Sequence, residues 1–243
     1  DISRETFNLD PNSVREIVES EDVDAILAVH LYGLPCDMDA LSKIAAEHDL
    51  ALIEDCAQAH GATYDGQRVG SYGDVACFSF YPTKNMTTGE GGMLTTDDET
   101  VAKRAESFVN HGRPPEGGYE HERVGHNFRM TSIAAAIGIK QLQSLPDYLS
   151  KRQANAEQFT ERIETETIRT PIVPGDRTHA YHQYTLLTEE RDKLLEYLHE
   201  KEVGAKVYYP TCIHQQPAYE NFDATAPVAE RVADEVVSIP VHP

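Results

Sequence analysis

Short apolar runs alternate with amphipathic stretches through the first half of the chain. Four of these runs have the length and composition of buried strands, and they occupy residues 24–30, 50–53, 75–80 and 92–96. Apolar residues recur at helical spacing over 38–48 and again over 98–109. Strands that alternate with helices in this way are typical of βαβ units. The pattern predicts an α/β fold, in which helices cover both faces of a mostly parallel sheet.

The second half of the chain is predicted to be helical at first and mixed afterwards. Helical spacing continues over 131–166, and Pro146 is expected to break this stretch into two helices. A smaller α+β unit follows, with strands near 181–187 and 205–208 and helices near 190–201 and 228–237. We therefore predict a large domain over 1–145, followed over 146–243 by a linking helix and a small C-terminal domain.

The composition is that of an ordinary globular protein. Of the 243 residues 40% are hydrophobic, and no apolar run approaches the ~18 residues of a transmembrane helix. The four cysteines, Cys36, Cys56, Cys77 and Cys212, form no C-x-x-C pair, so the sequence predicts neither a zinc site nor a disulfide framework. Unpaired cysteines are usual in a reducing compartment, and we expect a cytoplasmic protein that holds no metal.

The charge balance narrows the range of partners. The chain has 21 basic and 41 acidic residues, a formal net charge of −20, and the acids are spread along the sequence. Such a surface repels the phosphates of nucleic acids, and we expect neither a nucleic-acid nor a membrane partner. Only 8 of the 21 bases are lysines, which favours a protein from a salt-loving organism over a merely acidic mesophilic protein.

The halophile hypothesis predicts a salt-dependent stability. Molar potassium chloride screens the repulsion among surface carboxylates, so the melting temperature is expected to rise between dilute and molar salt. Differential scanning calorimetry over this range measures the effect. A melting temperature that stays level or falls would count against the hypothesis.

Two charged residues follow predicted strands at positions where ligands gather. Asp55 ends the second apolar run, and ligands of α/β sheets bind at the carboxyl ends of strands. Lys84 lies just beyond the third run, among aromatic residues, and an apolar pocket lowers the pKa of a lysine toward the neutral amine that forms imines. The structural alternatives are a helix cap or loop acid for Asp55 and, for Lys84, a side chain whose stem covers apolar surface.

Asp55 and Lys84 together suggest a cofactor. Pyridoxal phosphate forms a Schiff base with a lysine and needs an acid beside its pyridine nitrogen. Around the two residues stand the strings HLYG at 30–33, EDCAQAHGA at 54–62 and SFYPTKNMTTGEGG at 79–92. Three further regions of the chain carry matching strings: GHNFRM at 125–130, IHQQPAY at 213–219, and PVAER at 227–231 with IPVHP at 239–243.

In these strings the chain resembles the sugar-nucleotide aminotransferases of the DegT/DnrJ/StrS family, which have the aspartate-aminotransferase fold, type I. The resemblance covers nearly the whole chain in order, and its central strings are highly specific. It implies that Lys84 carries pyridoxal phosphate and then moves the proton during amino transfer. It also implies that Asp55 pairs with the pyridinium nitrogen, that Gln58 lies near the 3-oxygen of the ring, and that His60 supports the same wall of the pocket.

The resemblance further implies a site shared between subunits. Ser79 would bind the cofactor phosphate, and Asn127 would reach the phosphate of a neighbouring subunit in a homodimer. The structural alternatives are a strand-end cap for Ser79 and a turn residue for Asn127. The sequence departs from the family pattern at Cys56, where a small alanine is common, and in lacking the N-terminal segment that cups the phosphate. We therefore expect a chain incomplete at both ends that cannot work alone.

Aromatic residues of the second half are candidates for the substrate site, because they can hydrogen-bond a sugar or stack on a base. These residues are Tyr208, Tyr209, His214 and Tyr219. Packing within the small domain is the alternative for them, as it is for His182 and Tyr184.

The expected reaction is transfer of an amino group from glutamate or glutamine to a nucleotide-linked keto-sugar, with ping-pong kinetics, in amino-sugar and polysaccharide biosynthesis. Two alternatives remain. A dehydratase or lyase of the same fold would share Asp55, although relatives that dehydrate carry histidine in place of Lys84. A non-catalytic regulatory relative would need a degenerate pocket, and Lys84, Asp55 and Ser79 speak against one.

Overall fold

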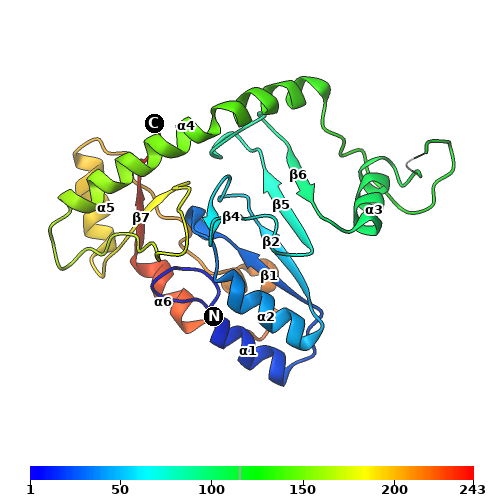
Figure 1. The fold of residues 1–243 in the computed structure, drawn as a ribbon. Coiled ribbons are helices and arrows are strands. Elements are labelled where there is room, and N and C mark those ends of the chain that lie inside the picture. Colours follow the sequence, from blue (N-terminus) through cyan, green and yellow to red (C-terminus); the bar gives the residue numbers. More distant parts are fainter. Residues whose placement is uncertain (115) are drawn as a thin grey trace.

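We call the part of the molecule that holds α1 to α3 and β1 to β6 the larger lobe, and the part that holds β7, β8, α5 and α6 the smaller lobe (Figure 1). A four-stranded sheet forms the centre of the larger lobe. It consists of β1 (Ala25–Val29), β2 (Ala51–Asp55), β5 (Val75–Ser79) and β6 (Gly92–Thr95), in the order β1-β2-β5-β6. The first three strands are parallel, and β6 is antiparallel to β5. The computed structural model that provides this arrangement describes residues 1–114 and 116–243. The predicted α/β class and the mostly parallel sheet are confirmed.

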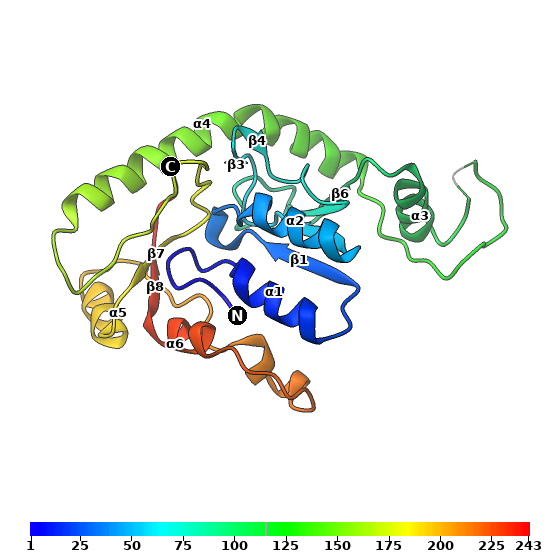
Figure 2. The ribbon, with the colours of Figure 1, turned by 60° about the horizontal axis from the view of Figure 1, so that its bottom comes forward.

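One face of the sheet packs against α2 (Met38–His48), and α1 (Pro11–Ser20) lies beside α2 (Figure 2). Both helices begin at an aspartate whose carboxylate accepts a hydrogen bond from a backbone N–H, Asp10 from that of Asn12 and Asp37 from that of Ala40. Apolar side chains of β1, β2 and α2 form the core between them: Ile26, Ala28, Met38, Leu41, Ile44 and Leu52. The short hairpin of β3 (Thr63–Tyr64) and β4 (Gln67–Arg68) adjoins this core through Tyr64.

The two faces of β2 carry different chemistry. Leu52 and Glu54 point into the buried face, and because side chains alternate along a strand, Ile53 and Asp55 point to the other face. On that second face Leu27 of β1 is 53% exposed and Leu94 of β6 is 40% exposed. The Asp55 face of the sheet is therefore open in the described part of the chain.

The helix α4 (Ser132–Arg162) runs along the larger lobe and continues to the smaller one (Figures 1 and 2). It is one continuous helix with Pro146 inside it, so the predicted break at Pro146 is wrong. A proline in a helix interior removes one hydrogen bond and costs about 3 kcal/mol. Packing of Leu145 against Phe80 and Met86, and of Leu149 against the same core, offsets this cost. The helix α3 (Glu99–Val109) lies at the far end, beyond β6.

The smaller lobe is built on a two-stranded antiparallel sheet of β7 (Tyr184–Leu187) and β8 (Val236–Ile239). The helices α5 (Arg191–Glu200) and α6 (Pro227–Glu235) accompany it, and short 3-10 turns occupy Leu31–Gly33, Ile213–Gln215 and Pro217–Tyr219. Val236 and Val237, predicted to end a helix, instead belong to β8, because their branched side chains are buried against β7. The predicted strand at 205–208 is reduced to a single bridge between Lys206 and Ser238.

Among the described residues, no helix combines the length and the apolar character that crossing a membrane requires.

Candidate functional site

Asp55 and Lys84 lie at the carboxyl ends of two neighbouring parallel strands, β2 and β5. Asp55 is the last residue of β2, and its carboxylate accepts a hydrogen bond from the backbone N–H of Ala57 at 2.9 Å. Lys84 follows β5 and is half-buried. Burial lowers the pKa of the Lys84 ammonium, while the Asp55 carboxylate acts in the opposite direction; the net shift is downward. The Lys84 amine is therefore easier to deprotonate than that of an exposed lysine, and the Asp55 carboxylate acts on its charge.

His60 is a buried ring with two polar atoms that lack partners. The ring packs against those of Phe78 and Phe80, at centroid distances of 5.7 and 5.9 Å, and the residue is only 2% exposed. Neither ring nitrogen has a hydrogen-bond partner among the described residues. Burial, followed by the nearby Lys84 ammonium, lowers the pKa of His60 to about 4, so the ring is neutral. Such orphaned nitrogens are costly unless a ligand or water meets them.

Gln58 connects the two lobes. Its Oε1 accepts a hydrogen bond from the backbone N–H of Tyr32 at 2.6 Å, and its Nε2 donates one to Oη of Tyr209 at 3.0 Å. The hydroxyl of Tyr32 donates to the backbone carbonyl of Tyr208. The structure thus brings Gln58 and Tyr209, which the sequence assigned to cofactor and substrate, into one hydrogen-bonded group.

Ser79 and Asn127 lie in different surroundings. Ser79 ends β5 on the same face of the sheet as Asp55, and its hydroxyl accepts a bond from the backbone N–H of Tyr81 at 3.3 Å. Asn127 is exposed and pairs with Asn110 in the segment between α3 and α4. That segment extends away from the sheet (Figure 1). Asn127 does not line the cleft at Lys84.

An open cleft of about 590 Å³ separates Lys84 from the smaller lobe. The larger lobe contributes Lys84, Tyr81 and Thr83, and the other wall includes residues of α4 and of the smaller lobe: Arg152, His182, Gln183, Lys206, Tyr208 and Tyr209. Burial, and then the charges of Lys84 and Arg152, lower the pKa of His182 to about 3.

Arg152 is a buried cation without an acidic partner. Its Nη1 donates to the backbone carbonyl of Tyr181 at 2.8 Å, and its Nε has no partner. No carboxylate of the described residues lies within salt-bridge distance, although the chain has nearly twice as many acids as bases. Burial lowers the pKa of its guanidinium. A cleft with Lys84, Arg152 and Lys206 on its walls suits an anionic ligand.

Three other residues predicted for the substrate site lie outside this cleft. The ring of His214 pairs with Glu230 at 2.8 Å, and Tyr219, 44% exposed, packs beside Phe222. Tyr184 is fully buried in the core of the smaller lobe, which agrees with the packing alternative. The sequence analysis missed Arg152, Gln183 and Lys206, because a cation within a long helix or beside a strand has no local signature.

A buried group of His30, Glu54 and Cys56 is the one place where ligand-type atoms of the described residues gather, within 4.8 Å of one another. The Glu54 carboxylate already receives four hydrogen bonds, from His30 and from the backbone N–H groups of Gly70, Tyr72 and Gly73. Burial raises the pKa of the Cys56 thiol. A metal would need the acceptor positions that these bonds occupy and a deprotonated thiol, so the arrangement is that of a hydrogen-bond network.

Residues 1–243 match the DegT/DnrJ/EryC1/StrS aminotransferase family, and the chain belongs to this family. It is 40% identical over 240 residues to dTDP-3-amino-3,6-dideoxy-alpha-D-galactopyranose transaminase of Aneurinibacillus thermoaerophilus, covering 98% of this chain and 65% of that protein. It is also 38% identical over 250 residues to a pleiotropic regulatory protein of Geobacillus stearothermophilus, covering 100% of this chain and 66% of the relative. The chain therefore spans about two thirds of the length of these curated relatives.

The fold agrees with that of solved structures of the family. Superposition on S. venezuelae DesV in complex with a ketimine intermediate gives a TM-score of 0.92 at 36% identity, covering 99% of this chain and 65% of that one. The predicted resemblance to this family is confirmed.

Proposed function

We propose that this chain is the part of a pyridoxal-phosphate-dependent aminotransferase that carries its lysine and its acid. The amino group would move from glutamate or glutamine to a nucleotide-linked keto-sugar. The observation that carries the proposal is the placement of Asp55 and Lys84 at the carboxyl ends of the neighbouring parallel strands β2 and β5, with Lys84 lining an open cleft. Membership of an aminotransferase family and likeness to a dTDP-sugar transaminase support the same activity.

The residues present fit the cofactor. The open face of the sheet carries Asp55 and Ser79 at the ends of neighbouring strands, and the buried ring nitrogens of His60 lack hydrogen-bond partners among the described residues. Pyridoxal phosphate, when bound, supplies a carbonyl that accepts an amino group and a ring that draws electrons from the donor's α-carbon. Lys84, Asp55, Gln58, His60 and Ser79 would hold it.

Each of these residues has a distinct task in the proposed reaction. Burial lowers the pKa of Lys84 and so favours its neutral amine. The Nζ atom of this amine would take the proton from the α-carbon of the donor. Asp55 would hold a proton at the pyridine nitrogen. The neutral rings of His60 and His182 add no positive charge that would compete with this proton. Arg152 and Lys206 would attract anionic groups of the substrates into the cleft.

The substrate and the assembly are part of the same proposal. Tyr209, at the cleft, would contact the sugar nucleotide, and His214 and Tyr219 would contribute if the substrate extends toward α6. Asn127, which is exposed and does not line the Lys84 cleft, would reach the phosphate bound by a second copy. The protein would act in the cytoplasm as a homodimer with shared sites.

Borohydride reduction of the cofactor-loaded protein is expected to attach a pyridoxyl group to Lys84. The half-buried amine of Lys84, whose pKa burial lowers, has the chemistry for this attachment. Peptide mass spectrometry locates the group, and Lys206, which lines the same cleft, serves as the internal control. A pyridoxyl group on another lysine, or none with the cofactor bound, would overturn the assignment of Lys84.

Product analysis separates amino transfer from the other reactions of this fold. When the protein meets a panel of nucleotide keto-sugars with ¹⁵N-glutamate, mass spectrometry should find the label in an amino sugar. Loss of water without label would indicate a dehydratase. Absence of both, with no pyridoxyl group on Lys84, would favour a regulatory role like that in the name of the Geobacillus stearothermophilus relative.

A further inference from the structure

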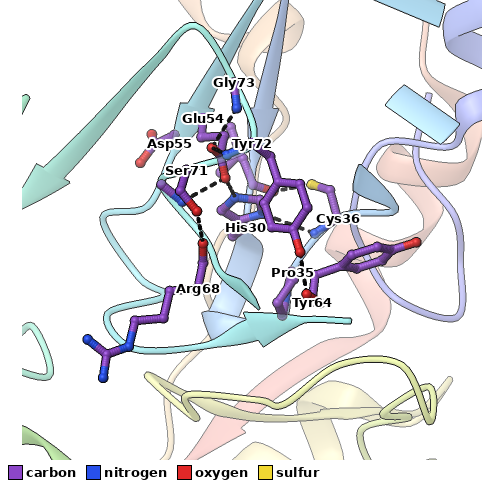
Figure 3. A network of polar contacts seen from close by, with 12 residues as sticks. His30, Pro35, Cys36, Glu54, Asp55, Tyr64, Arg68, Ser71, Tyr72 and Gly73 are labelled. Carbon is purple, nitrogen blue, oxygen red and sulfur yellow. Dashed lines mark hydrogen bonds and ion pairs between the residues drawn. The ribbon is translucent and has the colours of Figure 1, made fainter. Parts of the chain in front are cut away.

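The side chain of Glu54 is held by four hydrogen bonds at the end of β2 (Figure 3). Its Oε1 accepts from the backbone N–H groups of Tyr72 and Gly73, both at 2.8 Å. Its Oε2 accepts from the backbone N–H of Gly70 at 2.8 Å and lies 3.0 Å from Nε2 of His30. Glu54 is 0% exposed, so these groups replace all of its water.

His30 binds both Glu54 and the residue that follows it. The Nδ1 atom of His30 accepts a hydrogen bond from the backbone N–H of Cys36 at 3.0 Å, so the ring proton is on Nε2 and is donated to Glu54. The backbone N–H of His30 donates to the carbonyl of Asp55 at 3.1 Å. One residue of the β1 end thus holds the side chain of Glu54 and the main chain of Asp55.

A buried carboxylate is retained here in its charged form. Burial raises the pKa of Glu54, but the hydrogen bonds from His30 and from the backbone N–H groups of Gly70, Gly73 and Tyr72 outweigh it, and the net shift is downward. Taking a carboxylate out of water costs several kcal/mol, which well-placed donors must offset. Glu54, next to Asp55, is therefore held by four donors that together offset its desolvation.

Asp55 itself has little to fix its direction. Its carboxylate has one hydrogen bond, to the backbone N–H of Ala57 two residues further on. Glu54 and Asp55 point to opposite faces of β2, and Figure 3 shows the Asp55 carboxylate turned away from the network. The orientation of that carboxylate therefore follows from the backbone at the end of β2.

We propose that Glu54, acting through His30 and the 70–73 turn, is a positioning residue for Asp55, and the role of Asp55 itself rests on the proposed function. The network holds the end of β2 from the buried face, so that the Asp55 carboxylate on the open face keeps one direction toward the cofactor ring. Glu54 touches neither cofactor nor substrate.

A double-mutant cycle in the cofactor-loaded protein tests this role. The readout is the pH at which the absorption band of the bound cofactor changes, together with the rate of amino transfer. Glu54→Gln is expected to move that pH by about one unit, in the same direction as Asp55→Ala, and to slow transfer about 10-fold. In the Asp55→Ala background the same substitution should shift the pH at which the band changes by less than about 0.2 pH units, and should change the rate by less than about 2-fold.

Two further variants keep the test decisive. Glu47→Gln removes an exposed glutamate that pairs with Arg15 on the α1–α2 surface, and it should leave both readouts unchanged. If Glu54→Gln does not fold, His30→Gln retains an amide donor for Glu54 and should give a smaller change of the same sign that also vanishes without Asp55. Equal effects with and without Asp55 would overturn the positioning role while leaving the proposed function intact. Wild-type protein that shows no cofactor band would overturn the proposed function, and this inference with it.

Discussion

Replacing Asp55 with alanine is expected to slow amino transfer by about 10²-fold or more while the protein keeps its fold and some of its cofactor. The side chain makes a single hydrogen bond, to Ala57, and lies on the open face of the sheet, so its loss removes little packing. Its loss does remove the group that would hold a proton at the pyridine nitrogen. Single-turnover measurement with glutamate isolates this step from binding of the sugar nucleotide.

The matched control is Asp97→Ala, since Asp97 is an exposed acid in the turn between β6 and α3. Its rate should equal that of the wild type. Near-normal turnover in Asp55→Ala would mean that this acid only stabilises the turn at Ala57, and the assignment of the site would then fail.

Below pH 6.5 the protein without cofactor is expected to lose several kcal/mol of its free energy of unfolding. Burial is the main cause that lowers the pKa of His60 to about 4, and of His179 and His182 to about 3. In the unfolded chain each histidine takes up a proton near pH 6.5, whereas in the folded chain each stays neutral until far lower pH. The contribution to stability is thus complete above pH 6.5 and is lost as the pH falls.

Each such histidine contributes a slope of up to about 1.4 kcal/mol per pH unit, so three together give at most about 4 kcal/mol per unit. Urea denaturation at pH 7.5, 6.5, 5.5 and 5.0 measures the slope above the range in which carboxylates titrate. His179→Gln should reduce it by about one third, whatever its effect on stability at pH 7.5. A wild-type slope near zero would show that these rings are not held neutral.

The local pattern of apolar and polar residues was sufficient to predict most of the strands and helices of the larger lobe. The apolar runs at β1, β2 and β5 are short and buried, and the helical spacing over 38–48 and 98–109 is regular, so neighbouring residues alone specify these elements. Asp55 and Lys84 could be chosen for the same reason. Asp55 is the last residue of β2 and Lys84 comes shortly after the end of β5, and the carboxyl ends of parallel strands meet at one edge of the sheet.

Contacts between distant segments settled the rest. Pro146 stays inside α4 because Leu145 and Leu149 pack against Phe80 and Met86, about 60 residues earlier in the chain. Val236 becomes a strand residue because it pairs with Leu187 of β7. The bond between Gln58 and Tyr209 joins residues 151 positions apart, and Arg152 reaches the Lys84 cleft from the middle of a long helix. Hydrophobic periodicity predicts which face of each segment is buried and which is exposed to water. A functional site forms where segments distant in the sequence come into contact, and the pattern within one segment does not encode those contacts.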